Sequence, residues 1–129
     1  MYWYGSGSSD YTTVQGNKFI DNTLTEWYYY GMRIYYAGGS LVVKNNTAIQ
    51  RPSGTTSSGY GFYIYYPNNG PEISYNYVHA RYGGVYAYRM NYYPSSPVRG
   101  RYYNNMMTVD GTSTMYDIYC NYARHSDIA

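Results

Sequence analysis

The stretch GMRIYYAGGSLVVKNNTAI, residues 31–49, returns in altered form as GFYIYYPNNGPEISYNYVHA, residues 61–80. Both copies start at glycine, continue into a segment in which tyrosine alternates with apolar residues, and then reach asparagine. Short alternating segments bounded by Gly, Pro and Asn are typical of β-strands joined by tight turns. A repeat of about 30 residues therefore predicts a stack of similar units.

A motif centred on asparagine recurs along the chain. It consists of an apolar residue, two residues of any kind, Asn, one further residue and an apolar pair or near-pair. The asparagines follow one another at steps of 29, 30 and 29 residues. We expect them to stack at one corner of a coil, where Asn tolerates left-handed backbone and its amide can donate to the next carbonyl. The expected structural ladder is Asn17, Asn46, Asn76 and Asn105.

A second motif interleaves with the first and starts at Gly31, Gly61, Gly84 and Met115, at steps of 30, 23 and 31 residues. The short step has a simple explanation. A long loop precedes the motif at residues 51–61, whereas the corresponding loop follows it at residues 91–100. We expect the repeats to cover residues 12–122, between an N-terminal extension of residues 1–11 and a C-terminal tail of residues 123–129.

Two short strands in about 30 residues cannot bury an apolar face, but coils stacked at the ~4.8 Å strand spacing cover one another. On these two motifs the chain resembles the right-handed parallel β-helix repeats of the pectin-lyase-like superfamily, over residues 12–122. The resemblance implies an all-β fold, a right-handed parallel β-helix (solenoid) of about four coils. Because that superfamily includes lyases, hydrolases, phage tailspikes, adhesins and non-catalytic scaffolds, several functions stay open.

Strand alternation assigns side chains to the inside or the outside of the coils. The expected core is Met32, Ile34, Phe62, Ile64, Val85, Ala87, Tyr116 and Ile118, together with Val14, Phe19, Val43, Ala48, Ile73, Val78 and Met107.

Tyrosine dominates the outward positions. The chain has 24 Tyr against 2 Phe and 2 Trp, and tyrosine combines strand preference with an apolar ring and a polar hydroxyl. We expect two outward columns, which either stiffen the sheet or contact sugars or a second copy of the chain. The first is Tyr35, Tyr65, Tyr88 and Tyr119, and the second is Arg33, Tyr63, Tyr86 and Asp117.

Composition argues against several kinds of function. Charged residues make up 12% of the chain, the net charge is +2, and the arginines never form a run, so we expect no nucleic-acid partner. One cysteine, Cys120, gives neither a disulfide framework nor a zinc site, and we expect no metal and no cofactor. No apolar stretch is long enough for membrane insertion, and the N-terminus does not read as a signal peptide.

We identify no catalytic residue. Glycosidases need paired carboxylates, and the resemblance implies that lyases of this superfamily hold calcium with acidic residues and use Arg or Lys as the base. In the expected register no two of the seven acids lie on adjacent coils of one column. Glu72 lies nearest to Arg101, and we interpret them as a surface ion pair, while His79 is expected to be a partly buried wall residue.

These observations favour a non-catalytic structural or adhesive solenoid at an extracellular, cell or virion surface. Four coils make a short stack, and neither terminal segment is a strong polar cap, so we expect the chain to assemble with copies of itself. Polysaccharide is a further possible partner, through the tyrosine columns. The alternative is a fragment of a polysaccharide lyase, a hydrolase or a phage tailspike, whose acids lie on the loops or outside this chain.

Overall fold

The computed structural model describes residues 1–4, 17–27, 29–35, 41–50, 59–67, 69–91, 99–110, 116–124 and 126–129. These residues form three parallel sheets, which we name A, B and C. Sheet A contains β1 (Tyr2–Tyr4), β4 (Tyr30–Tyr35), β7 (Tyr60–Tyr65), β10 (Gly83–Tyr88) and β13 (Tyr116–Asn121). Sheet B contains β2 (Asn17–Ile20), β5 (Leu41–Lys44), β8 (Glu72–Ser74), β11 (Gly100–Tyr103) and β14 (Ser126–Ile128). Sheet C contains β3 (Thr23–Trp27), β6 (Thr47–Gln50), β9 (Tyr77–Ala80) and β12 (Met106–Val109).

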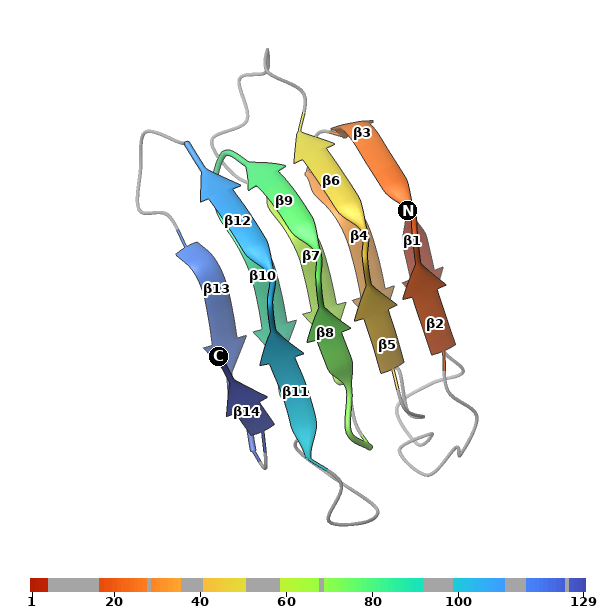
Figure 1. Cartoon of the computed structure of the whole chain (residues 1–129), viewed down its shortest axis with the longest axis vertical. Helices are drawn as coiled ribbons and strands as arrows, with labels where there is room; N and C mark the ends of the chain where they lie inside the picture. The colour runs from red at the N-terminus through yellow and green to blue at the C-terminus, as the bar shows by residue number, and fades with distance from the viewer. Residues whose placement is uncertain are drawn as a thin grey trace.

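The chain winds through the sheets in the order B, C, A, and each turn forms one coil. Coil 1 is β2–β3–β4, coil 2 is β5–β6–β7, coil 3 is β8–β9–β10 and coil 4 is β11–β12–β13. In Figure 1 the front strands of sheets B and C run upward, the strands of sheet A behind them run downward, and the coils advance from right to left. This path is right-handed, so the predicted right-handed parallel β-helix of about four coils is confirmed.

Both ends of the chain continue the solenoid. β1 pairs with β4, and the N-terminal ammonium of Met1 donates to the carbonyl of Gly31 at 2.7 Å. At the other end β14 pairs with β11, with Ile128 opposite Tyr102. Residues 1–11 and 123–129, which we expected to be an extension and a tail, therefore each contribute a strand to a sheet.

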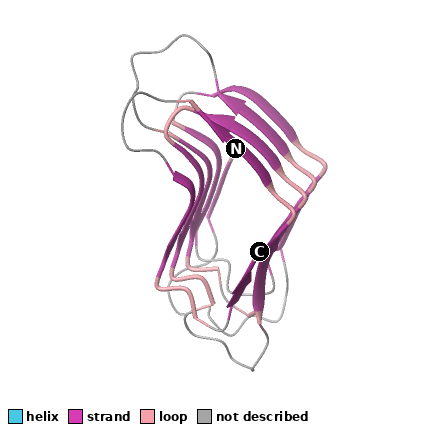
Figure 2. Ribbon diagram, turned by 60° about the vertical axis from the view of Figure 1, so that its left-hand side comes forward, coloured by secondary structure: helices cyan, strands magenta, loops and turns pink. Residues whose placement is uncertain are grey.

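The core lies between the three sheets, and Figure 2 shows their strands stacked one coil above another. Inward side chains are buried on strands that have a neighbour on both sides, whereas most of those on the edge strands are only partly buried. The fully buried set includes Met32, Ile34, Val43, Ala48, Phe62, Ile64, Ile73, Val78, Val85 and Ala87. The partly buried set is Phe19 and Leu24 at the N-terminal end and Met107, Ile118 and Cys120 at the C-terminal end. Val14, Met115 and the loop segments 51–58 and 92–98 lie outside the described residues.

The expected register of the last coil is wrong by two residues. In β13, Ile118 lies opposite Val85 and Cys120 opposite Ala87, so Tyr116 falls opposite Gly83 instead of in the predicted core column. A shift of two residues returns every side chain to the same side of the sheet. The alternating pattern therefore fits both registers, which is why it could not separate them.

Candidate functional site

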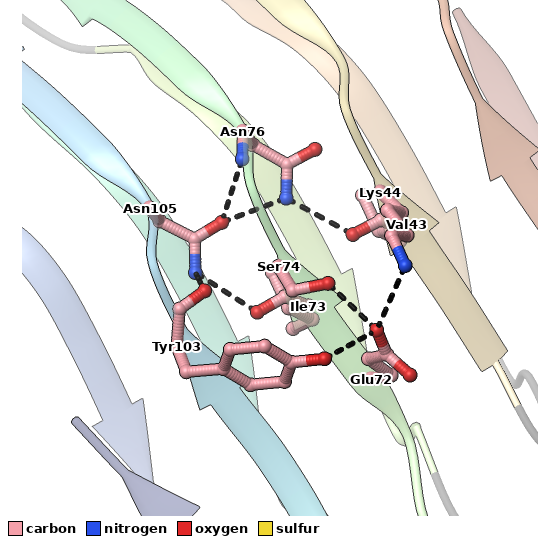
Figure 3. Close-up of polar contacts among 8 residues, drawn as sticks. All are labelled: Val43, Lys44, Glu72, Ile73, Ser74, Asn76, Tyr103 and Asn105. Carbon is pink, nitrogen blue, oxygen red and sulfur yellow. Dashed lines mark hydrogen bonds and ion pairs between the residues drawn. The ribbon is translucent and has the colours of Figure 1, made fainter.

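One corner of every coil carries an asparagine ladder between sheets B and C. Asn46 donates from its backbone N–H and its Nδ2 to Oδ1 of Asn76, at 3.0 and 2.9 Å. Asn76 repeats both bonds to Oδ1 of Asn105, at 3.1 and 2.8 Å (Figure 3). The Nδ2 groups of Asn46, Asn76 and Asn105 also donate to carbonyls of the preceding coil, at 2.9 Å in each case. Buried amides thus join successive coils through neutral hydrogen bonds.

The first ladder position belongs to Asn22, whose Nδ2 donates to Oδ1 of Asn46 at 2.8 Å. Asn17, which we expected there, begins β2 opposite Leu41. The expected match failed because the first coil reaches its corner five residues later than the 29-residue step predicts. The signal that could have found Asn22 is the dipeptide Asp21–Asn22, which resembles the pairs at residues 45–46 and 104–105.

The left-handed backbone at this corner belongs to the residue before each ladder asparagine. Asp21, Asn45, Tyr75 and Asn104 have φ angles of 58°, 54°, 54° and 52°. Asp and Asn adopt this conformation more readily than other non-glycine residues, and three of the four positions carry them. The ladder asparagines therefore supply hydrogen bonds, while their neighbours supply the turn, two roles that we had assigned to one residue.

Glu72 lies beside the ladder and accepts hydroxyl hydrogen bonds. Ser74 and Tyr103 donate to its Oε1 at 2.7 and 2.8 Å, and the ammonium of Lys44 lies 3.9 Å away (Figure 3). The hydrogen bonds from Ser74 and Tyr103 lower the pKa of Glu72. Arg101 is its strand neighbour, as expected, and adds to this electrostatic effect. Glu72 is thus held as a carboxylate on the outside of sheet B.

The outer surface of sheet A, which we call the tyrosine face, carries two stacked columns of rings. Tyr65 and Tyr88 stack with centroids 4.5 Å apart and planes 11° apart. In the second column Tyr63 and Tyr86 stack at 4.7 Å and 6°, and Tyr86 and Tyr119 at 5.2 Å and 10°. Offset stacking of this kind stabilises each pair by roughly 0.5–1.5 kcal/mol.

The tyrosine face differs from the expected one at its C-terminal end. Tyr119 continues the column of Tyr86, and Asn121 instead lies opposite Tyr88, because of the two-residue shift in β13. Asp117 therefore leaves the second column, and its side chain lies outside the described part of the chain. At the N-terminal end Tyr35 lies in the first column, as expected, with its ring 5.3 Å from that of Tyr65 and tilted by 35°.

Arg33 replaces a ring in the second column and lies among four tyrosines. Its guanidinium carbon is 4.8 Å from the ring centroids of Tyr30 and Tyr35, 5.5 Å from that of Tyr2 and 5.6 Å from that of Tyr63. Its Nε donates to the hydroxyl of Tyr35 at 3.0 Å. A cation over ring faces is electrostatically favourable, so Arg33 fits this column without a carboxylate partner among the described residues.

Stacking of the rings determines which atoms of the tyrosine face a ligand can contact. The ring of Tyr86 has Tyr63 on one side and Tyr119 on the other, so little of either ring face is open to a sugar. Burial, followed by the neighbouring tyrosines, raises the pKa of Tyr63 to about 12, which keeps its hydroxyl protonated at neutral pH. The surface therefore offers ring edges and neutral hydroxyls in rows along the solenoid.

A second aromatic corner, which sequence reasoning missed, follows sheet A. Tyr66, Arg89 and Tyr122 all have positive φ angles, of 56°, 54° and 56°. The guanidinium of Arg89 lies 4.9 Å from the ring of Tyr66, 5.3 Å from that of Tyr88 and 5.9 Å from that of Tyr122, and it donates to the Tyr66 hydroxyl. Nothing in the residue types predicted left-handed backbone here, because Tyr and Arg disfavour it.

Two other polar contacts are surface pairs. His79 lies between Ile49 and Thr108, is partly exposed, and contacts Asp110 at 2.9 Å. Arg99 holds Asp127 through contacts of 2.5–3.0 Å, and this bidentate hydrogen bonding lowers the pKa of Asp127. Among the described residues, no three His, Cys, Asp or Glu side chains form a group suited to a metal ion. No helix in the described ranges is long and apolar enough to cross a membrane.

Comparisons of the chain with protein-family models, with curated proteins and with solved structures found no match. Any function proposed for the chain therefore rests on the geometry of the solenoid, in particular on its tyrosine face and its two ends.

Proposed function

We propose that the protein is a non-catalytic structural solenoid that assembles end to end with copies of itself, at an extracellular, cell or virion surface. The observation that carries the proposal is the state of its two ends. In the described part of the chain, β1, β2 and β3 each have a strand neighbour on one side only, and so do β12, β13 and β14. Such edges hold unpaired backbone donors and acceptors, which readily pair with another chain.

The side chains at these ends support the same proposal. Phe19 and Leu24 at one end and Met107 and Ile118 at the other point toward the core but are only partly buried. Ile128 occupies the core column of Tyr102 and is 50% exposed, so β14 is no polar cap. A second solenoid placed on either end would cover apolar surface and pair with exposed strand edges, which is favourable on both counts.

Adhesion to polysaccharide through the tyrosine face is a second proposed role. Rows of half-buried tyrosine hydroxyls on successive coils support it, since each hydroxyl can donate and accept a hydrogen bond. This contact would use hydroxyls and ring edges, because the stacked rings cover one another's faces.

The proposal of assembly is tested by placing a charge in the end column. Ile128→Lys puts an ammonium where a second copy would bury it, so we expect the dissociation constant for self-association to rise by at least roughly a hundredfold. Ile128→Val keeps an apolar side chain and is the matched control. Sedimentation velocity over a range of concentrations measures both variants beside the wild type.

Because Ile128 is half exposed in the single chain, both variants should unfold at denaturant concentrations close to the wild type, within about 1 kcal/mol of its stability. Large assemblies for the wild type and Ile128→Val, with a folded monomer for Ile128→Lys, would support the proposal. A wild-type chain that stays monomeric at every concentration would refute it. The Ile128→Lys monomer then allows polysaccharide binding to be measured without assembly.

A further inference from the structure

We infer that copies of the chain join head to tail in one register, in which β14 of one copy pairs with β2 of the next and β13 pairs with β1. This inference rests on the proposed end-to-end assembly and adds to it the orientation, the contacts and the spacing of the joint. It follows from the strand order at the two ends, from charge and from apolar side chains.

The two ends each contain part of one coil. β1 belongs to sheet A and precedes coil 1, whereas β14 belongs to sheet B and follows coil 4. If sheet A continues into the next copy, β1 of that copy pairs with β13 of the first. It then lies at the same height along the solenoid axis as β14 of the first copy, which continues sheet B (Figure 1). β14 and the neighbour's β1 then form two sides of a shared coil. Among the described strands, none lies on its third side, in sheet C.

Sheet B defines the register of the joint. Its outward column runs Lys18, Val42, Glu72, Arg101 and Asp127. Continuing the column places Lys18 of the next copy beside Asp127, so a cation follows an anion. Asp127 already pairs with Arg99, but a carboxylate has acceptor sites for more than one donor.

The inward column of sheet B continues equally well. It runs Phe19, Val43, Ile73, Tyr102 and Ile128, so Phe19 of the next copy would pack on Ile128. Ile128 is half exposed in the single chain, and Phe19 is partly buried. Joining them covers apolar surface at the centre of the contact, while the charged pair lies at its rim.

Sheet A agrees with the same register. Tyr2, Arg33, Tyr63, Tyr86 and Tyr119 form one column, and continuing it places Tyr2 of the next copy beside Tyr119. Tyr2 is 61% exposed in the single chain. The second column of the tyrosine face would thus continue across the joint.

Other registers fit less well. A slip of one residue in sheet B would set Lys18 beside Ile128 in the core column and turn Phe19 outward. A slip of two residues would set Ile20, which is 41% exposed, beside Asp127. Head-to-head and tail-to-tail contacts would bring Lys18 near Lys18, or Asp127 near Asp127, and would pair parallel sheets in antiparallel fashion.

Cysteine cross-linking tests the register directly. Cys120→Ala removes the native thiol, and Ala is already the residue at the neighbouring position 87. In this background we would mix a Lys18→Cys protein with an Asp127→Cys protein and oxidise the mixture with oxidised glutathione. Adjacent parallel strands bring in-register Cα atoms to about 5 Å, within disulfide range, whereas positions two residues apart lie about 8 Å away.

We expect the Lys18→Cys and Asp127→Cys mixture to give roughly tenfold more disulfide dimer than Ile20→Cys mixed with Asp127→Cys, and than either protein alone. Cross-linked dimer of Lys18→Cys alone, or of Asp127→Cys alone, at equal yield would overturn the head-to-tail orientation. Equal yield with Ile20→Cys would overturn the register.

Electron microscopy of the same samples separates the two proposals. If the unoxidised proteins form assemblies but the Lys18–Asp127 pair does not cross-link, the inferred register is wrong while self-assembly stands. If no assemblies form at any concentration, both proposals are wrong.

Discussion

At the scale of single residues, the asparagine ladder is the main polar stabilisation of the interior. Asn76 is 2% exposed, and its Oδ1 accepts both the backbone N–H and the Nδ2 of Asn46. Its own Nδ2 satisfies the carbonyl of Val43. Removing this side chain would leave buried groups on coil 2 without partners, and a buried unsatisfied group costs about 1–3 kcal/mol.

We therefore predict that Asn76→Ala lowers the free energy of unfolding by about 3 kcal/mol, since more than one buried group loses its partner. Asn22→Ala is the matched control, because Asn22 begins the ladder, is only partly buried and accepts no side-chain bond from a preceding ladder residue among the described residues. For it we predict a loss of about 1 kcal/mol. Urea denaturation followed by circular dichroism measures both, and equal losses would contradict this account of the ladder.

The sequence predicted three of the four ladder positions, because a steady step identifies a corner wherever loops leave it undisturbed. It missed Asn22 since the step from Asn22 to Asn46 is 24 residues, and a nearer match at Asn17 fitted the step better. The sequence also could not show which corner residue forms the ladder hydrogen bonds and which one adopts left-handed backbone. Residue type suggests that Asn tolerates this conformation, but in the structure it is the residue before each ladder asparagine that adopts it.

At the scale of elements, close packing between neighbouring strands explains the glycines that begin the second motif. A Cβ on Gly61 would lie 2.1 Å from Cγ1 of Val78 and 2.9 Å from the carbonyl oxygen of Gly84. Sheet A here approaches sheet C too closely for any side chain. Gly61, and Gly31 with Ala48 of sheet C nearby, are thus contact points between two sheets.

We predict that Gly61→Ala destabilises the solenoid by about 3 kcal/mol, since overpacking forces backbone shifts. The double variant Gly61→Ala/Val78→Ala removes the clashing methyl groups and should regain part of the loss relative to the sum of the single variants. Gly61 also approaches backbone, so recovery will be incomplete. Thermal unfolding of the wild type, the two single variants and the double variant gives the coupling free energy between positions 61 and 78. Strictly additive effects would show that contact with Val78 is not the reason why position 61 needs glycine.

The inside-outside pattern could be predicted from alternation, and the assignment of Tyr35, Tyr63, Tyr65, Tyr86 and Tyr88 to the outer surface agrees with the structure. The register of β13 could not be predicted, because a two-residue shift preserves alternation. The two terminal strands could not be predicted either. β1 and β14 contain only three residues each, which is too short for a periodic pattern to indicate a strand.

At the scale of the whole molecule, the described coils form a short stack whose two ends match one another. Lys18 and Phe19 at one end continue the columns that finish with Asp127 and Ile128 at the other. Strand pairing and apolar contact would supply most of the affinity. The charged pair would contribute little energy at an exposed rim but would favour one orientation.

The inferred joint fixes the spacing of a filament. Each copy adds its four coils and one shared coil, so it advances by five strand spacings, or about 24 Å at ~4.8 Å each. If the copies met without a shared coil, each would advance by six strand spacings, or about 29 Å. Electron microscopy of wild-type assemblies, with the axial repeat read from averaged images, tests the central claim most directly. We predict filaments with a subunit repeat of about 24 Å, in which the strand spacing of sheets A and B continues across the joints. A folded monomer at every concentration, or an assembly with another repeat, would contradict it.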